Sequence, residues 1–198
     1  MYAMPAPDTK SAIRREALRL FSERGFAAVS MRELAEAVGM HQGGIYNHFP
    51  SKQALLVDLM ATHINALLEA HEAAMEEVQG PEAQLRAFVQ NHVSYHLDYP
   101  KDVFLAYMEL RSLDAVNRKD IVALRNRYEQ SLRTILEEGR SRGLFRIDDA
   151  AVHARMLLSM LTGATTWYRD DGRLDRDAIV ACHVRGAMQS VGLEVTEP

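Results

Sequence analysis

Cysteine is nearly absent from this chain of 198 residues, in which Cys182 is the single example. One cysteine excludes an intrachain disulfide framework and a zinc finger built on cysteines. Glycine and proline are also scarce, with 11 and 6 residues, and alternating runs of Val, Ile and Thr are few. Long stretches without helix breakers therefore favour helices over strands.

The sequence also lacks an apolar run long enough to cross a bilayer, which requires about 20 residues. The longest such run, residues 156–168, is interrupted by Ser and Thr and lies between Arg155 and Arg169. The first residues carry no apolar segment followed by a small-residue cleavage site, as a secretion signal would. We therefore expect a cytoplasmic protein of one or two compact domains.

Net charge is −4, a value that by itself argues against a nucleic-acid partner. The charges are unevenly distributed, however. Residues 1–52 hold seven Lys and Arg against five Asp and Glu, whereas the remaining residues hold 16 against 22. A basic N-terminal part on an acidic body is compatible with DNA binding, because phosphates respond to the local field and not to the mean charge.

The N-terminal part contains the patterns of two helices. Apolar residues recur on one helical face of residues 9–24: Ile13, Ala17, Leu20 and Phe21. A second helix is predicted to begin at Ser30, because Ser30 and Glu33 form a capping box in which each side chain binds a free amide of the first turn. Gly39 is expected to end this helix in the left-handed conformation.

A third short helix is predicted over residues 42–49, after a turn of about four residues. Ile45 and Phe49 supply its buried side, so that polar residues of the helix face outward. Gly43 and Gly44 each cost roughly 1 kcal/mol inside a helix, which indicates that another molecule must approach the backbone closely. Two short helices joined by a tight turn form a helix-turn-helix unit, whose second helix can enter the major groove of DNA.

The rest of the sequence predicts further helices, and hence an all-α protein. They are expected over residues 51–79, 82–98, from 100 onward, 114–141, 148–168 and 175–191.

The N-terminal residues resemble the DNA-binding head of TetR/AcrR-type transcriptional regulators. The resemblance spans about residues 9–57 and rests on Ala17-Leu18-Arg19-Leu20-Phe21, Gly25-Phe26, Ser30 to Ala35, Val38-Gly39, Gly43, Ile45-Tyr46, His48-Phe49, Ser51-Lys52 and Leu55-Leu56. It implies a nine-helix TetR-like fold, with a helix-turn-helix domain at 8–52 and a ligand-binding and dimerisation domain at 53–192. It also implies a homodimeric, ligand-responsive repressor that binds a palindromic DNA operator and is not an enzyme.

By position, the resemblance implies DNA-binding residues at three places: the start of the first helix of the unit, its second helix, and the start of the helix that follows. They are Ser30, Met31, Arg32, His41, Gln42, Gly43, Gly44, Tyr46, Asn47, His48 and Lys52. The sequence departs from the family pattern at two of them. His41 replaces the usual Ser or Thr cap, and Gly44 replaces a residue with a hydroxyl group, which removes one potential donor to a phosphate or base.

The C-terminal part offers candidates for an effector site. The segments Trp167-Tyr168-Arg169 and Gly172-Arg173-Leu174 are similar to a branch of the family that senses acyl-CoA thioesters. Such a pocket is usually lined by large apolar residues and a few polar ones that bind the ligand. Each of these residues could instead simply pack in the core of the protein. The candidates are Phe88, His92, Tyr95, Phe104, Tyr107, Met108, Arg111, Arg125, Met160 and Trp167.

The last two predicted helices have broad apolar faces, which favour a four-helix contact with a second chain. The residues expected in this contact are Leu157, Leu161, Ala164, Val180, Val184, Ala187, Met188 and Val191.

Two alternatives to a DNA-binding regulator remain open from the sequence. His92 and His96 lie at i and i+4, a spacing that can chelate a metal, but no third ligand is evident, so we expect no metal and no cofactor. The same histidines could supply the base of a small helical enzyme acting on acyl thioesters, although no nucleophile accompanies them. An adaptor whose helix-turn-helix binds a protein instead of DNA is the other alternative.

Overall fold

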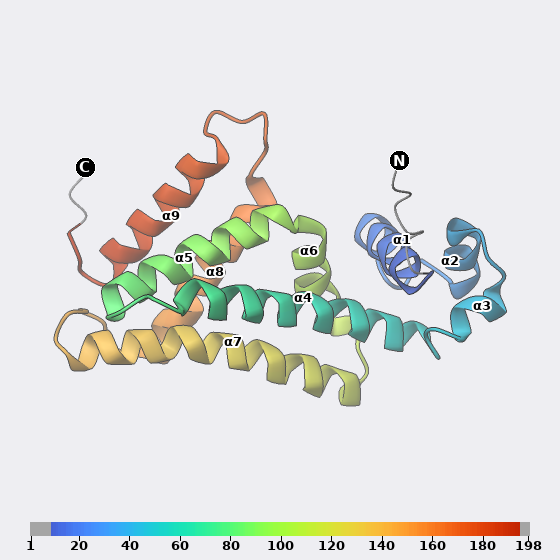
Figure 1. Ribbon diagram of the computed structural model, residues 1–198, viewed down its shortest axis with the longest axis horizontal. Helices are drawn as coiled ribbons and strands as arrows, with labels where there is room; N and C mark the ends of the chain where they lie inside the picture. The colour runs from blue at the N-terminus through green and yellow to red at the C-terminus, as the bar shows by residue number, and fades with distance from the viewer. Residues whose placement is uncertain (1–8, 195–198) are drawn as a thin grey trace. The chain divides into compact units, whose positions relative to one another are not determined.

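The computed structural model describes residues 9–194, which contain nine α-helices, one 3-10 helix and no strand (Figure 1). The predicted all-α class is therefore confirmed. None of the helices in this range is both long and apolar enough to cross a membrane. In chain order they are α1 (Thr9–Arg24), α2 (Met31–Val38), α3 (Gln42–Tyr46), α4 (Lys52–Met75), α5 (Pro81–Asp98), α6 (Pro100–Met108), η1 (Glu109–Ser112), α7 (Ala115–Ser141), α8 (Ala150–Trp167) and α9 (Arg176–Ser190).

The predicted start and stop of α2 are confirmed at the level of single hydrogen bonds. Ser30 Oγ accepts the Glu33 N–H at 3.2 Å, and the Glu33 carboxylate accepts the Ser30 N–H at 2.8 Å. Gly39 follows the helix with a φ of 76°, a left-handed conformation that glycine adopts without steric cost. The capping box and the glycine together fix the length of α2 before any long-range contact is considered.

Two elements differ from the prediction. α3 ends at Tyr46 and not near residue 49, because the N–H groups of His48 and Phe49 both donate to the Ile45 carbonyl at 2.9 Å and close a turn. α4 ends at Met75, earlier than the expected residue 79. The 3-10 helix η1 was not predicted, since its four residues carry no periodic pattern.

The helices pack into two compact units. Within the described residues, the first unit comprises residues 9–63 and Lys101–Val122, and the second comprises Ile64–Pro100 and residues 123–194. α4 and α7 each contribute residues to both units. The first unit is therefore larger than the segment 8–52 that the sequence assigned to DNA binding, since it also contains α6, η1 and the start of α7.

The core of the first unit is formed by the predicted face of α1 together with apolar side chains from α2 to α4. Ile13, Ala17 and Phe21 are fully buried, as are Ile45 and Leu55. Burying side chains of this size contributes roughly 1.5–3 kcal/mol each.

A charged contact also joins α1 to α4 within this unit. The Arg14 guanidinium donates to both carboxylate oxygens of Asp58, at 2.6 and 2.8 Å. Because the contact is bidentate, it orients the two helices as well as attracting them.

The core of the second unit contains aromatic and histidine rings that pack edge-on, tilted or stacked against one another. Phe88 of α5 lies 5.1 Å from His71 of α4 and 5.2 Å from Tyr128 of α7, measured between ring centroids. His92 and His96, one turn apart on α5, stack at 3.8 Å. These rings hold α4, α5 and α7 together inside the unit.

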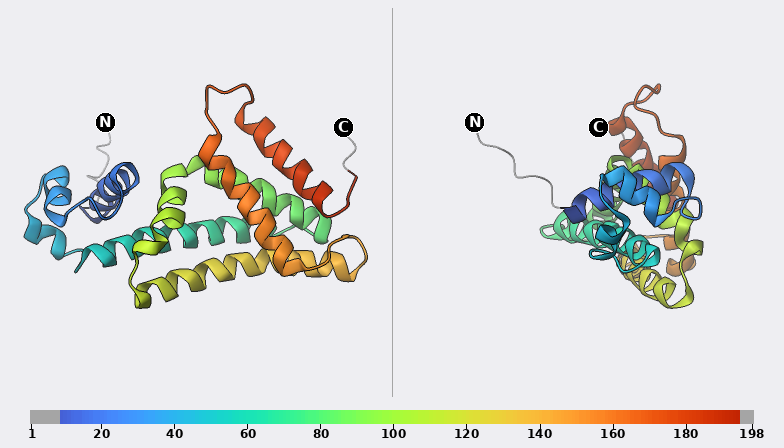
Figure 2. Two further views of the ribbon diagram at one scale, coloured as in Figure 1. Left: turned by 180° about the vertical axis from the view of Figure 1, so that it is seen from behind. Right: turned by 90° about the vertical axis from the view of Figure 1, so that its right-hand side faces the viewer.

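The apolar faces expected to meet a second chain are covered within the protomer. α5 packs against both α8 and α9, as the left view of Figure 2 shows. Val180 is half-buried, and the other seven residues expected in the dimer contact are buried in this core: Leu157, Leu161, Ala164, Val184, Ala187, Met188 and Val191. The seven buried residues offer little surface to a second chain, so their assignment to a dimer contact is wrong, whereas that of Val180 stays a prediction.

The opposite side of α8 is exposed and also apolar. Val152, Met156, Met160 and Trp167 project from it, with Met156 61% and Trp167 54% exposed. The spacing of these residues places them on one stripe of the helix.

Burial of His63 makes the stability of the fold depend on pH. Burial lowers the pKa of His63 from 6.5 to about 4. As the pH falls through 6.5, the unfolded chain takes up a proton that the folded chain does not bind until about pH 4, so stability is lost in this window. Between pH 7 and pH 5 the wild type should lose about 1–2 kcal/mol more unfolding free energy than His63→Gln.

Urea unfolding at the two pH values measures this difference. The matched control is His41→Gln, which makes the same substitution at an exposed position. Equal losses for the wild type and His63→Gln would contradict the prediction.

Candidate nucleic-acid interface

α2, the turn at Gly39–His41 and α3 form the predicted helix-turn-helix unit. The Met40 N–H donates to the Ala35 carbonyl at 2.9 Å and closes the turn directly behind α2. His41 stands at the N-cap of α3 with an extended backbone, but its side chain makes no capping hydrogen bond. The departure from the usual Ser or Thr thus leaves α3 without a side-chain cap.

The start of α2 carries a carboxylate held in its charged form. The Ser30 N–H, the Ser30 hydroxyl and the Arg24 guanidinium all bind Glu33 and lower its pKa from 4.5 to about 2. Arg24 donates to Glu33 Oε1 at 2.9 Å. The negative charge at this helix N-terminus also interacts favourably with the helix dipole.

One side of α3 is buried and the other faces outward. Ile45 is fully buried and Phe49 nearly so, which holds the segment against the first unit. Outside this contact, Tyr46 is 44% exposed. The other predicted residues of this segment are exposed at His41, Gln42, Gly43 and Asn47 and half-buried at Gly44 and His48. Amide and phenol groups on such a surface can bind base edges and phosphates.

The two glycines of α3 have different surroundings. A Cβ atom at Gly43 would meet nothing within 4 Å, whereas one at Gly44 would lie 2.7 Å from Cε of Met40. A Cβ atom at Gly44 would therefore require only the end of a flexible side chain to move. No neighbouring protein atom explains the glycine at position 43, where the open backbone leaves room for close approach of an external molecule.

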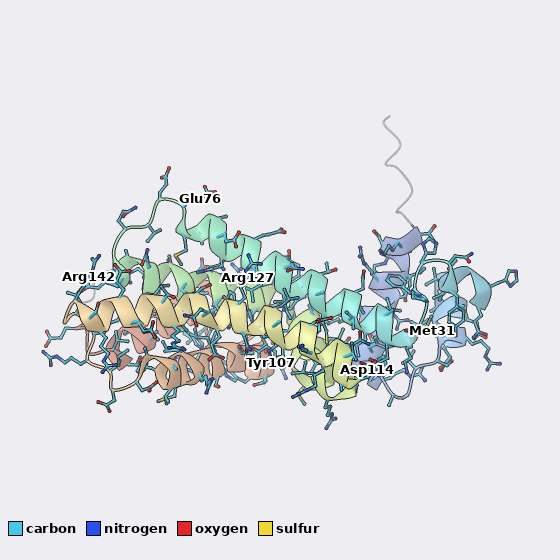
Figure 3. The ribbon with its side chains drawn as sticks, turned by 90° about the horizontal axis from the view of Figure 1, so that it is seen from below. Met31, Glu76, Tyr107, Asp114, Arg127 and Arg142 are labelled. Carbon is cyan, nitrogen blue, oxygen red and sulfur yellow. The ribbon has the colours of Figure 1, made fainter. Side chains whose placement is uncertain are left out.

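Three predicted residues near α2 have different environments. Ser30 is exposed, with its side chain engaged in the capping box. Met31, labelled in Figure 3, is only 7% exposed, so its side chain belongs to the core and is wrongly assigned to the DNA-binding set. Arg32 is exposed, with 75% of its side chain accessible, and its Nε lies 3.7 Å from Glu36 Oε1.

Lys52 is half-buried, and its ammonium group is directed at the turn that follows α1. Its Nζ donates to the Phe26 carbonyl and lies 4.1 Å from the centroid of the Phe26 ring. Burial lowers its pKa, while the charges of Glu109 and Glu33 act in the opposite direction. In this structure the Lys52 ammonium therefore contacts the backbone of its own chain, and the phosphate contact expected for it stays a prediction.

Sequence reasoning missed Glu109, a buried carboxylate that binds the backbone of Phe26. The two residues are 83 positions apart, and no short motif links them. A buried acid directly after a predicted helix has no periodic signature, so the sequence offered no signal for it.

The effector-site candidates divide between the two units. Phe104, Tyr107, Met108 and Arg111 belong to the first unit and are exposed. The others belong to the second unit: Phe88, His92, Tyr95, Arg125, Met160 and Trp167.

The candidates of the second unit do not form one set. Phe88 and His92 are buried, and the ring nitrogens of His92 are hydrogen-bonded to the Tyr128 hydroxyl and to Thr162 Oγ1, both at 3.1 Å. Tyr95 and Arg125 are half-buried. Met160 and Trp167 lie on the exposed side of α8, so neither lines the interior of the unit.

Trp167 instead lines a surface hollow of about 250 Å³ with Tyr168, Arg169 and Arg173. Among residues 9–194, no three His, Cys, Asp or Glu side chains are grouped so that they could hold a metal ion.

Comparison with known proteins identifies the family. Residues 13–59 match the model described as "Bacterial regulatory proteins, tetR family", and residues 78–191 match that of the "Tetracyclin repressor-like, C-terminal domain". The chain belongs to the TetR family. It is therefore a DNA-binding transcriptional regulator and not an enzyme, which removes the alternative of an enzyme with His92 or His96 as its base.

Curated and structural relatives agree with this assignment. The transcriptional repressor KstR2 of Rhodococcus jostii is 30% identical over 185 residues, which cover 88% of this chain and 90% of that protein. The crystal structure of the TetR family regulator PfmR from Thermus thermophilus is 34% identical with a TM-score of 0.81, covering 92% of this chain and 99% of that one.

AibR in complex with isovaleryl coenzyme A and operator DNA is a further structural relative of this TetR family member. It is 27% identical with a TM-score of 0.84, and the match covers 90% of this chain and 97% of that one.

The open backbone at Gly43 gives a test of close approach by DNA. Gly43→Ala should keep or raise thermal stability, because alanine is favoured in helices by about 1 kcal/mol and its methyl group meets no protein atom. Affinity for duplex DNA should nevertheless fall by about tenfold or more, as a methyl group at the contact costs on the order of 1.4 kcal/mol.

Fluorescence anisotropy and a melting curve on the same sample measure both quantities. Gly44→Ala is the matched comparison, since its methyl group lies at a half-buried position and displaces only the end of the Met40 side chain. Unchanged DNA affinity in Gly43→Ala would refute the close approach.

Proposed function

We propose that this TetR family member is a homodimeric repressor that binds a two-fold symmetric operator and is released by a small-molecule effector. The observation that carries the proposal is the exposed side of α3, where Gln42, Tyr46 and Asn47 project from a segment that Ile45 holds from behind. The names of the relatives KstR2 and NicS, both transcriptional repressors, support repression over activation. Such a regulator acts in the cytoplasm, where its operator lies.

The exposed stripe of α8 is the proposed dimer surface. Large apolar side chains in one exposed stripe are typical of a surface that another protein covers. Val152, Met156, Met160 and Trp167 form the stripe, and Cys182 of α9 is exposed as well. Two-fold symmetry would pair this stripe with itself and present two copies of α3. Two copies of α3 read two half-sites about 34–36 Å apart, one turn of the double helix.

Footprinting on the DNA that flanks the gene of this protein tests the proposal. Purified wild-type chain should protect two inverted half-sites one helical turn apart. Absence of any protected site would contradict an operator beside the gene of this protein.

Charge placed in the stripe should break the dimer. Met156→Lys introduces a cation into the proposed contact, so sedimentation should show a monomer and the footprint should be lost. The control is Val116→Lys, at an apolar residue of α7 that is 76% exposed in the first unit. A dimeric Met156→Lys protein would refute this surface while leaving DNA binding intact.

An acyl-CoA thioester is the proposed effector class. The support is the similarity to AibR, whose crystal structure contains isovaleryl coenzyme A. α4 is one continuous helix with residues in both units. It therefore connects the unit that contains the DNA-binding segment directly to the second unit. Tenfold release of the operator requires a coupling free energy of only about 1.4 kcal/mol.

Thermal-shift measurements with a panel of acyl-CoA thioesters test the effector class. A ligand at 100 times its Kd stabilises the folded state by about 2.7 kcal/mol, which should raise the melting temperature by several degrees. Free coenzyme A is the control for the acyl group, and each hit should also release the footprinted duplex. A panel without any shift would remove the thioester proposal and leave the repressor proposal standing.

A further inference from the structure

The peptide groups around Phe26 are held by two charged side chains of opposite sign. Phe26 lies in the turn between α1 and α2, directly after Gly25, whose φ is 83°. The Phe26 N–H donates to Glu109 Oε1 at 3.0 Å, and Lys52 Nζ donates to the Phe26 carbonyl. We call Lys52 and Glu109 together the Phe26 clamp. All of these residues belong to the first unit.

Glu109 of the clamp is buried, and Lys52 is half-buried. Glu109 is 7% exposed, and its second oxygen accepts the Ser112 hydroxyl at 2.5 Å. The Lys52 ammonium lies over the Phe26 ring and 5.8 Å from the Phe21 ring. Buried charges are costly unless they are hydrogen-bonded and compensated, so each partner of the clamp favours the position of the other.

Gln53 extends the same contact to the end of η1. Its Nε2 donates to the Ser112 carbonyl at 2.7 Å, and its Oε1 accepts the Asp114 N–H at 3.3 Å. Successive residues of α4 therefore hold the α1–α2 turn and the segment after α6. The exposed surface of α3 takes no part in these contacts.

The clamp sets how the chain enters the helix-turn-helix. Phe26 precedes the N-cap Ser30 by four residues, and α2 packs against both α1 and α3. A shift of the turn would therefore displace α2 and α3 relative to α1. We propose that Lys52 and Glu109 are positioning residues for DNA binding, and that the Lys52 ammonium supports affinity by holding the turn and not by contacting a phosphate.

This inference rests on the proposed binding of operator DNA, and salt dependence separates the two roles of Lys52. A side chain that contacts a phosphate contributes about 0.9 to the slope of log K against log salt concentration. A side chain that only positions the surface changes the affinity and leaves this slope unchanged.

The experiment measures binding of the footprinted duplex over a series of salt concentrations. Lys52→Met keeps the apolar stem and removes the ammonium, and Glu109→Ala removes the carboxylate. Both should lower affinity by about tenfold or more with the wild-type slope. Glu109→Gln keeps an oxygen that can accept the Phe26 N–H and should restore most of the affinity lost in Glu109→Ala.

Two further variants serve as controls. Arg32→Ala removes an exposed guanidinium of α2 that is predicted to contact DNA, so its slope should fall by about 0.9. Glu77→Ala removes an exposed carboxylate of the second unit and should match the wild type. Circular dichroism and melting curves establish the folded fraction to which each affinity is normalised.

Should Glu109→Ala be unfolded, Lys52→Met and Ser112→Ala decide the question, because each weakens the clamp while the Glu109 side chain stays in place. Reduced affinity with the wild-type slope in either supports the inference, and wild-type affinity in both overturns it. A slope lowered by about 0.9 in Lys52→Met also overturns it, while operator binding itself stands. A wild-type chain that binds no duplex overturns the proposed function and this inference together.

Discussion

Hydrogen bonds to the peptide groups of Phe26 are the polar contacts on which the first unit depends most. A turn between two helices leaves backbone groups without helical partners, and they must be satisfied elsewhere when the turn is buried. In this protein Glu109 satisfies the N–H and Lys52 the carbonyl. Residues 101–122 therefore belong to the same compact unit as α1, α2 and α3.

The surface assigned to DNA depends on this arrangement in a simple way. The side chains that fix α2 and α3 are buried or engaged in caps, as with Ser30, Met31 and Ile45. Gln42, Tyr46 and Asn47 are then presented by a backbone that does not need them for its own stability. Separate residues therefore stabilise the unit and face the DNA. This suits a DNA-binding protein, because the exposed side chains can change without unfolding the helices that carry them.

Helical amphipathicity alone did not identify the partner of each face of α8 and α9. Both sides of α8 carry large apolar residues, with Leu157 and Leu161 on one side and Met156 and Met160 on the other. A pattern of this kind predicts that each side is covered, but not by which element. In the folded chain α5 packs against α8 and Leu157 is buried, so the Met156 side is the one that we propose for a second chain.

The sequence by itself determined the all-α class, the capping box of α2, its glycine stop and the resemblance to TetR regulators. The helices and their caps arise from residues within about four positions of one another, where local hydrogen bonds and helical periodicity decide the outcome, and the resemblance comes from the order of such local patterns along residues 9–57. Only the tertiary structure decided that Lys52 and Glu109 both reach Phe26 and which side of α8 is free. Those outcomes depend on contacts between distant segments, and the low dielectric of the interior then selects partners for each buried charge.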